Sequence, residues 1–213
     1  MLLDLIYPPV CGICDKINKK NLCKKCELKI KKYEINKIED YRNDNLKYFD
    51  YQIKMFRYEN IIREKIIDYK FNEKAYLYKT FEKMILKTKK TYSFLKKYDI
   101  ILYVPMFKKH KLIRGYNQSE LIAQRLSNVL GIKLEKNNLV KIIETKKQST
   151  LTKNQREKNV KNAFKLKNPE KIKDKKVILF DDIYTTGSTV NECSKILKKA
   201  GATEIAILTI AVD

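Results

Sequence analysis

The stretch from residue 177 to residue 212 constrains the fold most strongly. It begins with a fully apolar run at residues 177–180 and ends with a mainly apolar run at residues 205–212. Between them apolar residues recur at helical spacing, and Gly201 stands where that helix would end. Strands of a parallel sheet are buried on both faces, so a strand–helix–strand unit of this kind predicts an α/β fold with a right-handed crossover.

A second apolar run adds a strand to the same sheet. Residues 100–105 are apolar and end at Pro105, which is typical of a short buried strand. Asn117 with Glu120 three residues later is a common helix start, and Gly131 marks the expected end of that helix. We therefore expect another strand–helix unit before the first.

Composition divides the chain into three parts. Residues 1–30 hold four closely spaced cysteines and are expected to fold around a metal. Residues 31–95 are rich in Lys, Tyr and Asn, with apolar residues near helical spacing, which predicts a helical connecting segment. Residues 96–213 carry the strands described above and form the predicted α/β domain.

Two adjacent carboxylates and a hydroxyl-rich loop follow the run at residues 177–180. Asp181 and Asp182 come first, and the segment that we call the hydroxyl loop consists of Thr185, Thr186, Gly187, Ser188 and Thr189. The carboxyl end of a parallel strand opens into the crevice where such sheets bind ligands. The helix start that follows offers unpaired N–H groups to a phosphate, and Gly187 lets the backbone approach it closely.

The two acids restrict the kind of phosphate compound that fits. Two carboxylates would repel a bare polyphosphate, but they can accept hydrogen bonds from sugar hydroxyls or act with a bound Mg²⁺. A molecule that carries sugar hydroxyls and a 5′-phosphate is a ribose phosphate. This interpretation would fail if both acids were turned inward into pairs with lysines.

The segment 177–189 resembles the phosphoribosyl-pyrophosphate (PRPP) signature of type I phosphoribosyltransferases. The resemblance implies a parallel sheet flanked by helices, with Asp181 and Asp182 on the ribose 2′- and 3′-hydroxyls and the hydroxyl loop around the 5′-phosphate. Some members carry a further acid where this chain has Thr185. Because Thr185 cannot exchange a proton near neutral pH, any acid or base of a transfer reaction stays unassigned.

Three further motifs are similar to those of the ComF family, whose members are linked to DNA uptake in naturally transformable bacteria. They are Arg114-Gly115-Tyr116-Asn117-Gln118, the segment from Gln148-Ser149-Thr150 to Arg156-x-x-Asn159-Val160-x-x-Ala163-Phe164, and Asp181-Asp182-x-Tyr184-Thr185-Thr186-Gly187. Lys70-Phe71 is also similar to a family element. The resemblance implies PRPP binding with Mg²⁺ and spans essentially the whole chain.

The residues themselves support a more modest interpretation of these motifs. Arg114 can contact a pyrophosphate with two hydrogen bonds, or it can form a surface ion pair. Asn117 fits a helix cap as well as a ligand contact. His110 is better explained as a solvated residue than as a catalytic acid, since lysines flank it on both sides.

The amino-terminal cysteines have the spacing of a metal site. Cys11-x-x-Cys14 and Cys23-x-x-Cys26 each present two thiols, and four thiolates complete a tetrahedral shell that suits zinc. Such a shell leaves no open position, so the predicted zinc ribbon is structural. A redox-active pair, the alternative, would need only one Cys-x-x-Cys motif. Cys193 falls on the apolar face of a predicted helix and is expected to be a buried thiol.

The net charge of +22 attracts polyanions, although 41 lysines and only 6 arginines indicate a compositional drift as well. Residues 141–176 are densest, with 13 basic and 4 acidic residues, and form either a solvated lysine surface or a surface that follows phosphates. The first nine residues contain Asp4 and Pro8-Pro9 and do not resemble a signal peptide. We therefore expect a cytoplasmic protein without a membrane span.

Three functions fit these features. The first is a ComF-like protein of DNA uptake that binds PRPP with Mg²⁺ and single-stranded DNA, with proteins of the competence machinery as further candidate partners. The second is an active phosphoribosyltransferase that transfers phosphoribosyl to a nucleobase-type acceptor, so whether the chain is an enzyme stays open. The third is a nucleic-acid-binding module with a vestigial sugar site, which the intact Asp181-Asp182 pair argues against.

Overall fold

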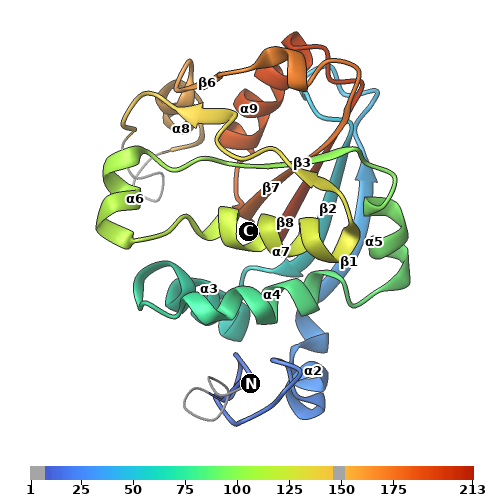
Figure 1. The fold of residues 1–213 in the computed structure, drawn as a ribbon, viewed down its shortest axis with the longest axis vertical. Helices are drawn as coiled ribbons and strands as arrows, with labels where there is room; N and C mark the ends of the chain where they lie inside the picture. The colour runs from blue at the N-terminus through green and yellow to red at the C-terminus, as the bar shows by residue number, and fades with distance from the viewer. Residues whose placement is uncertain (1–7, 146–151) are drawn as a thin grey trace.

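The computed structural model describes residues 8–145 and 152–213, which are drawn as a ribbon in Figure 1. Within these residues one sheet has six strands in the order β1-β2-β8-β7-β3-β4. The strands are β1 (Glu34–Asp40), β2 (Tyr51–Arg57), β3 (Ile100–Tyr103), β4 (Lys133–Leu134), β7 (Lys176–Tyr184) and β8 (Glu204–Val212). All neighbours are parallel except β1, which pairs antiparallel with β2 at one edge. The predicted α/β sheet is confirmed as a mixed, mainly parallel sheet.

Helices cover both faces of this sheet (Figure 1). One face packs against α3 (Asn60–Phe71), α4 (Tyr78–Ile85) and α7 (Gln118–Leu130). The other face packs against α9 (Ser188–Lys199) and the two-stranded sheet of β5 (Leu139–Lys141) and β6 (Phe164–Leu166). Alternate residues of β7 divide between these cores: Ile178 and Phe180 face the first, Val177 and Leu179 the second.

The remaining elements are short. They are the helices α2 (Lys24–Ile30), α5 (Lys89–Leu95), α6 (Lys108–Arg114) and α8 (Lys153–Val160), and the 3₁₀ turns η1 (Lys31–Tyr33), η2 (Ala75–Leu77) and η4 (Pro169–Lys171). Among the described residues no helix has both the length and the apolar character needed to cross a membrane.

The predicted helix boundaries around α7 are confirmed. The side chain of Asn117 accepts hydrogen bonds from the backbone N–H groups of Ser119 at 2.9 Å and Glu120 at 3.4 Å. Gly131 ends the helix with a φ of 66°, in the left-handed region that glycine adopts readily. The predicted buried thiol is also confirmed, because Cys193 is fully buried between α9 and the sheet.

The segment 31–95 contains more than the helices expected there. It holds α3, α4 and α5, but also β1 and β2, both of which belong to the main sheet. The prediction missed β1 because this edge strand reads Glu-Ile-Asn-Lys-Ile-Glu-Asp, and charged residues at a sheet edge obscure the strand pattern. The division at residues 30 and 95 stays a prediction.

The four-cysteine segment packs directly onto α4. Cys11 and Cys26 belong to the same buried cluster as Leu77 and the helix that follows it. The hydroxyl of Thr80 in α4 donates a hydrogen bond of 2.8 Å to the backbone carbonyl of Asn21. This segment is therefore attached to the body of the protein through buried contacts as well as through the chain.

Gly12 offers a test of this packing, because a methyl group on its Cα would collide with the side chains of Thr80 and Leu77. We predict that Gly12→Ala lowers the free energy of unfolding by about 1–3 kcal/mol, the usual cost of overpacking. Urea unfolding measures the change. Lys29→Ala on the exposed face of α2 is the control and should change stability by less than about 0.5 kcal/mol. Equal stability of the Gly12→Ala protein and the wild type would contradict the packing described here.

Candidate functional site

The predicted acid pair lies on a central strand of the sheet. Asp181 and Asp182 occupy β7, between β8 and β3, near the carboxyl end that the three parallel strands share. They are inside the strand rather than just beyond it, because β7 continues to Tyr184 alongside β8. Ligands of parallel α/β sheets bind at this end, so the two carboxylates are in the expected position.

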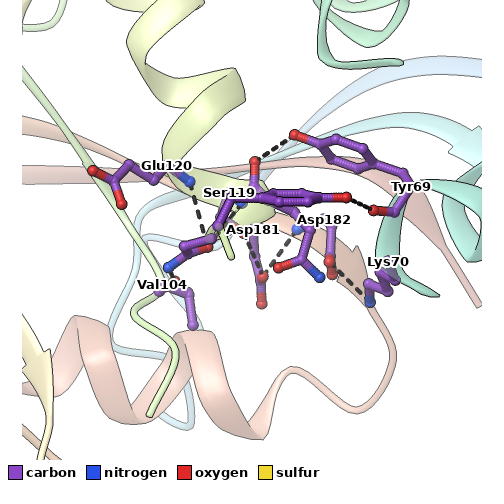
Figure 2. Close-up of polar contacts among 10 residues, drawn as sticks. Tyr69, Lys70, Val104, Ser119, Glu120, Asp181 and Asp182 are labelled. Carbon is purple, nitrogen blue, oxygen red and sulfur yellow. Dashed lines mark hydrogen bonds and ion pairs between the residues drawn. The ribbon is translucent and has the colours of Figure 1, made fainter. Parts of the chain in front are cut away.

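Asp182 is held by an ion pair with a lysine of α3. Its carboxylate oxygen Oδ2 lies 2.9 Å from Nζ of Lys70, at the end of α3 (Figure 2). Arg114, the last residue of α6, stacks its guanidinium over the ring of Phe71 at 5.1 Å. Burial lowers the pKa of Arg114, while the negative charge of Asp182 acts in the opposite direction. Asp182 therefore forms an ion pair with Lys70, and Arg114 lies near enough for the two side chains to interact electrostatically.

Asp181 is held by hydrogen bonds. Its Oδ1 accepts from the backbone N–H of Asp182 at 2.9 Å and from the hydroxyl of Ser119 at 3.4 Å (Figure 2). Burial and the neighbouring charge of Asp182 raise the pKa of Asp181 to about 7, although Lys70 and these hydrogen bonds favour the charged form. Among the described residues, Asp182 is therefore the acid that has a lysine partner. The sugar interpretation would fail if both acids were paired with lysines, and this condition is not met.

Residues of the Arg114–Gln118 motif join α3 to α7 behind the acids. The hydroxyl of Tyr69 donates to the backbone carbonyl of Gln118 at 2.8 Å, and the hydroxyl of Tyr116 donates to the backbone carbonyl of Tyr69 (Figure 2). Asn117 caps α7, as the bottom-up interpretation allowed, and also donates to the carbonyl of Val104 at 3.3 Å. These contacts hold Ser119 and Lys70 beside the acid pair.

The hydroxyl loop shares a small pocket with Asp181. The pocket is lined by Asp181, Ile183, Tyr184, Thr185, Gly187, Ser188, Thr189 and Val190. Thr186 is the one loop residue outside this lining, and its hydroxyl shares a hydrogen bond of 2.8 Å with the hydroxyl of Ser188. Gly187 has a φ of 77°, and a side chain there would collide with the ring of Tyr184. Helix α9 begins at this loop, so the partial positive charge of its amino-terminal end lies beside the pocket and suits an anion.

The structure therefore brings together most of the predicted residues, in two groups. Asp181 and the hydroxyl loop form one group next to α9. Asp182, Arg114 and Lys70 form the other, next to α3 and α6. The predicted Gln148–Thr150 loop lies outside the described residues. Arg156 and Asn159 lie on α8, as the helical spacing predicted.

Two lysines near the acids were not predicted as site residues. Lys70 was noted only for its resemblance to a family element, and Lys141 only as part of a basic stretch. Lys141, at the end of β5, donates to the hydroxyl of Thr145 at 2.6 Å. Burial lowers the pKa of Lys141, whereas the charge of Asp181 acts in the opposite direction. The predicted solvated residue, His110, is about half exposed on α6 and lies 3.1 Å from Glu144.

The four amino-terminal cysteines form one cluster. Their Sγ atoms all lie within 4.8 Å of one another, and Cys14 and Cys23 are 3.9 Å apart. Tetrahedral coordination with bonds of about 2.3 Å would separate sulfurs by about 3.8 Å, so the cluster fits a metal ion of that kind. The backbone N–H of Cys23 points to the sulfur of Cys11 at 3.4 Å, a contact that stabilises a thiolate ligand. A metal could therefore be held by Cys11, Cys14, Cys23 and Cys26.

Comparison with known proteins agrees with the fold and the site. Residues 117–213 match the phosphoribosyl transferase domain. This match begins at the cap of α7 and includes the acid pair and the hydroxyl loop. The fold is that of the phosphoribosyltransferase superfamily.

Three curated relatives narrow the assignment. Competence protein F of Haemophilus influenzae is 36% identical over 67% of this chain and 64% of that protein. DNA utilization protein YhgH of Salmonella typhi is 34% identical over 51% of this chain and 47% of the relative. Competence protein ComFC of Streptococcus pneumoniae is 28% identical over 73% of this chain and 66% of the relative. The chain covers less than two thirds of the length of each relative. Together with the domain match, these similarities support the ComF family within the phosphoribosyltransferase superfamily.

The raised pKa of Asp181 predicts a pH-dependent cost to stability. An acid with a higher pKa in the folded than in the unfolded protein stabilises the fold when protonated, and this contribution is lost as the pH rises towards about 7. Asp181→Asn keeps the acceptor oxygen but not the charge. We predict that this variant gains at least about 1 kcal/mol in unfolding free energy relative to the wild type between pH 5 and pH 8.

Denaturant unfolding of both proteins at several pH values measures this difference. Asp44→Asn is the matched control, because Asp44 lies in an exposed turn and its side chain caps the backbone N–H of Leu46. A difference between the Asp181→Asn protein and the wild type that stays constant over this pH range would contradict the assigned ionisation.

Proposed function

We propose that this protein acts in DNA uptake as a ComF-like protein and binds PRPP with Mg²⁺ at the acid pair and the hydroxyl loop. The observation that carries the proposal is the pocket in which Asp181 and four residues of the hydroxyl loop meet. The names of the relatives, competence protein and DNA utilization protein, support the role in DNA uptake.

The chemistry of the site supports a ribose phosphate as the ligand. The positive end of α9 and the hydroxyls of the loop suit the 5′-phosphate. Asp181 and Asp182 supply four oxygens that can accept hydrogen bonds from the 2′- and 3′-hydroxyls. Carboxylate oxygens and diphosphate oxygens are also the ligands that Mg²⁺ prefers, so the ion would enter together with PRPP.

Transfer of phosphoribosyl to a nucleobase-type acceptor is the alternative function. The site residues that hold the sugar would serve both functions equally. Thr185, at the position where some phosphoribosyltransferases carry an acid, cannot donate a proton to the acceptor near neutral pH. We therefore propose ligand binding in DNA uptake ahead of catalysis.

Exposed lysines support binding to single-stranded DNA. Exposed lysines of the described residues include eight around the four cysteines (Lys16, Lys19, Lys20, Lys24, Lys25, Lys29, Lys31 and Lys32) and seven within residues 161–176 (Lys161, Lys165, Lys167, Lys171, Lys173, Lys175 and Lys176). Lysines contact phosphates without reading bases, so the proposed binding has no sequence preference. Its affinity should fall steeply with salt.

Zinc is the metal that we propose for the four cysteines. Soft thiolates favour it, and a shell of four cysteines gives it a structural role. Free thiols persist in a reducing compartment, which agrees with a protein of the cytoplasm.

PRPP with Mg²⁺ is expected to stabilise the folded protein. A ligand at 100 times its dissociation constant adds about 2.7 kcal/mol, which corresponds to a rise in melting temperature of about 5–10 °C for a chain of this size. Calorimetric melting with and without millimolar ligand measures the shift. The double variant Asp181→Asn/Asp182→Asn should lose most of it, and an unchanged wild-type melting temperature would rule the proposal out.

Two further measurements separate this function from its alternatives. Release of pyrophosphate from PRPP that depends on an added nucleobase would favour the transferase instead. Binding of single-stranded DNA by the double Asn variant at wild-type affinity would show that the DNA surface and the sugar site are separate.

Metal analysis tests the zinc assignment. We predict one zinc per chain and, after chelation, faster hydrogen exchange first in residues 1–30, because a segment this small cannot fold stably without its metal. The exchange of β7 and β8 serves as the internal control and should stay slow. A metal-free protein in which all four thiols react freely would contradict the assignment.

A further inference from the structure

The ion pair between Lys70 and Asp182 occupies one of the two acids proposed for the ribose hydroxyls. The distance is 2.9 Å, and the side chains are only 20% and 11% exposed. With so little of Asp182 open to the crevice, a ribose hydroxyl reaches its carboxylate only if the ammonium group of Lys70 moves aside. Lys70 then needs another anionic partner, because an unpaired charge in a half-buried position is costly.

The position of Lys70 indicates where that partner lies. The hydroxyl loop belongs to the α9 layer, whereas Lys70 comes from α3 on the other face of the sheet. Arg114, at the end of α6, stacks on Phe71 at the end of the same helix α3. The acids of β7 lie between the two layers. In a ribose, carbons 2 and 3 separate C1 from C4, which carries the 5′-phosphate arm. A sugar with its 5′-phosphate in the loop and its hydroxyls on the acids thus directs C1 towards Lys70.

We propose that Lys70 is a specificity-determining residue whose ammonium group exchanges Asp182 for an anionic group on C1 of the ribose. A sugar with a phosphate or diphosphate on C1 restores the partner of Lys70 after the exchange. Ribose 5-phosphate lacks that group, so it must break the ion pair without replacing it. This inference rests on the proposed function. It adds that the site selects against sugars that have no phosphate or diphosphate on C1.

Lys70 is better suited to this exchange than Arg114. A lysine carries a compact charge on a flexible stem and can redirect its donors by rotating single bonds. The guanidinium of Arg114 is stacked on Phe71, which limits its movement. Arg114 therefore supplies a fixed positive charge near Asp182, and Lys70 supplies the mobile one.

Titration calorimetry of the full chain at constant ionic strength tests the proposal with two ligands, PRPP with Mg²⁺ and ribose 5-phosphate with Mg²⁺. The quantity of interest is the ratio of their affinities. Lys70→Met should lower this ratio at least about tenfold, the loss expected for one charge-assisted hydrogen bond. The decrease should come from weaker binding of PRPP, while ribose 5-phosphate binds equally well or more tightly.

Lys74→Met is the matched control. Lys74 lies four residues from Lys70, and its ammonium group pairs with Asp68 at 3.0 Å rather than with the acid pair. The substitution removes the same charge, so a general electrostatic effect would appear in both variants. The affinity ratio of Lys74→Met should equal that of the wild type, and a tenfold decrease in it would overturn the proposal.

A second variant covers the case in which Lys70→Met does not fold. Lys70→Gln keeps an N–H donor for Asp182 without the charge and should show the same loss of ratio. A parallel decrease in affinity for both ligands would overturn the proposal, since it would mean that Lys70 only positions Asp182. If the wild type binds neither ligand, the proposed function itself fails, whereas wild-type binding with an unchanged ratio in both variants refutes this inference alone.

Discussion

Two adjacent carboxylates on a central β-strand are the constraint on which the rest of this structure depends. A charge at such a position needs a cation or hydrogen-bond donors, and two like charges side by side need them more. Asp182 has Lys70 at 2.9 Å, and Asp181 has the backbone N–H of Asp182 and the hydroxyl of Ser119. Even so, burial raises the pKa of Asp181 to about 7. Because this arrangement costs stability, we infer that the two acids are kept for binding a ligand.

The elements around the acids were predictable where burial is complete. Strands β7 and β8 are buried on both faces, so their sequences are almost continuously apolar and mark a parallel sheet. The cap at Asn117 was predictable because its side chain acts on the two residues that follow it. Strand β1 was missed because it lies at the edge of the sheet, where its two isoleucines, Ile35 and Ile38, are three residues apart among polar and charged residues and do not show the alternation of a strand.

The same distinction applies to the site. Asp181, Asp182 and the hydroxyl loop are close in sequence, so their local pattern identified them. The partners Lys70 and Ser119 come from α3 and α7, and only the folded chain places them beside the acids. Nothing in composition separates Lys70 or Lys141 from the other lysines of a chain that has 41 of them. Contacts between distant segments, and not local motifs, complete this site.

A crystal structure of the protein with bound PRPP and Mg²⁺ tests the central claim most directly. The account predicts ribose hydroxyls within hydrogen-bond distance of Asp181 and Asp182, and the 5′-phosphate against the backbone N–H groups of the hydroxyl loop. A sugar bound elsewhere, or an empty pocket with Asp182 still paired to Lys70 at saturating ligand, would contradict it.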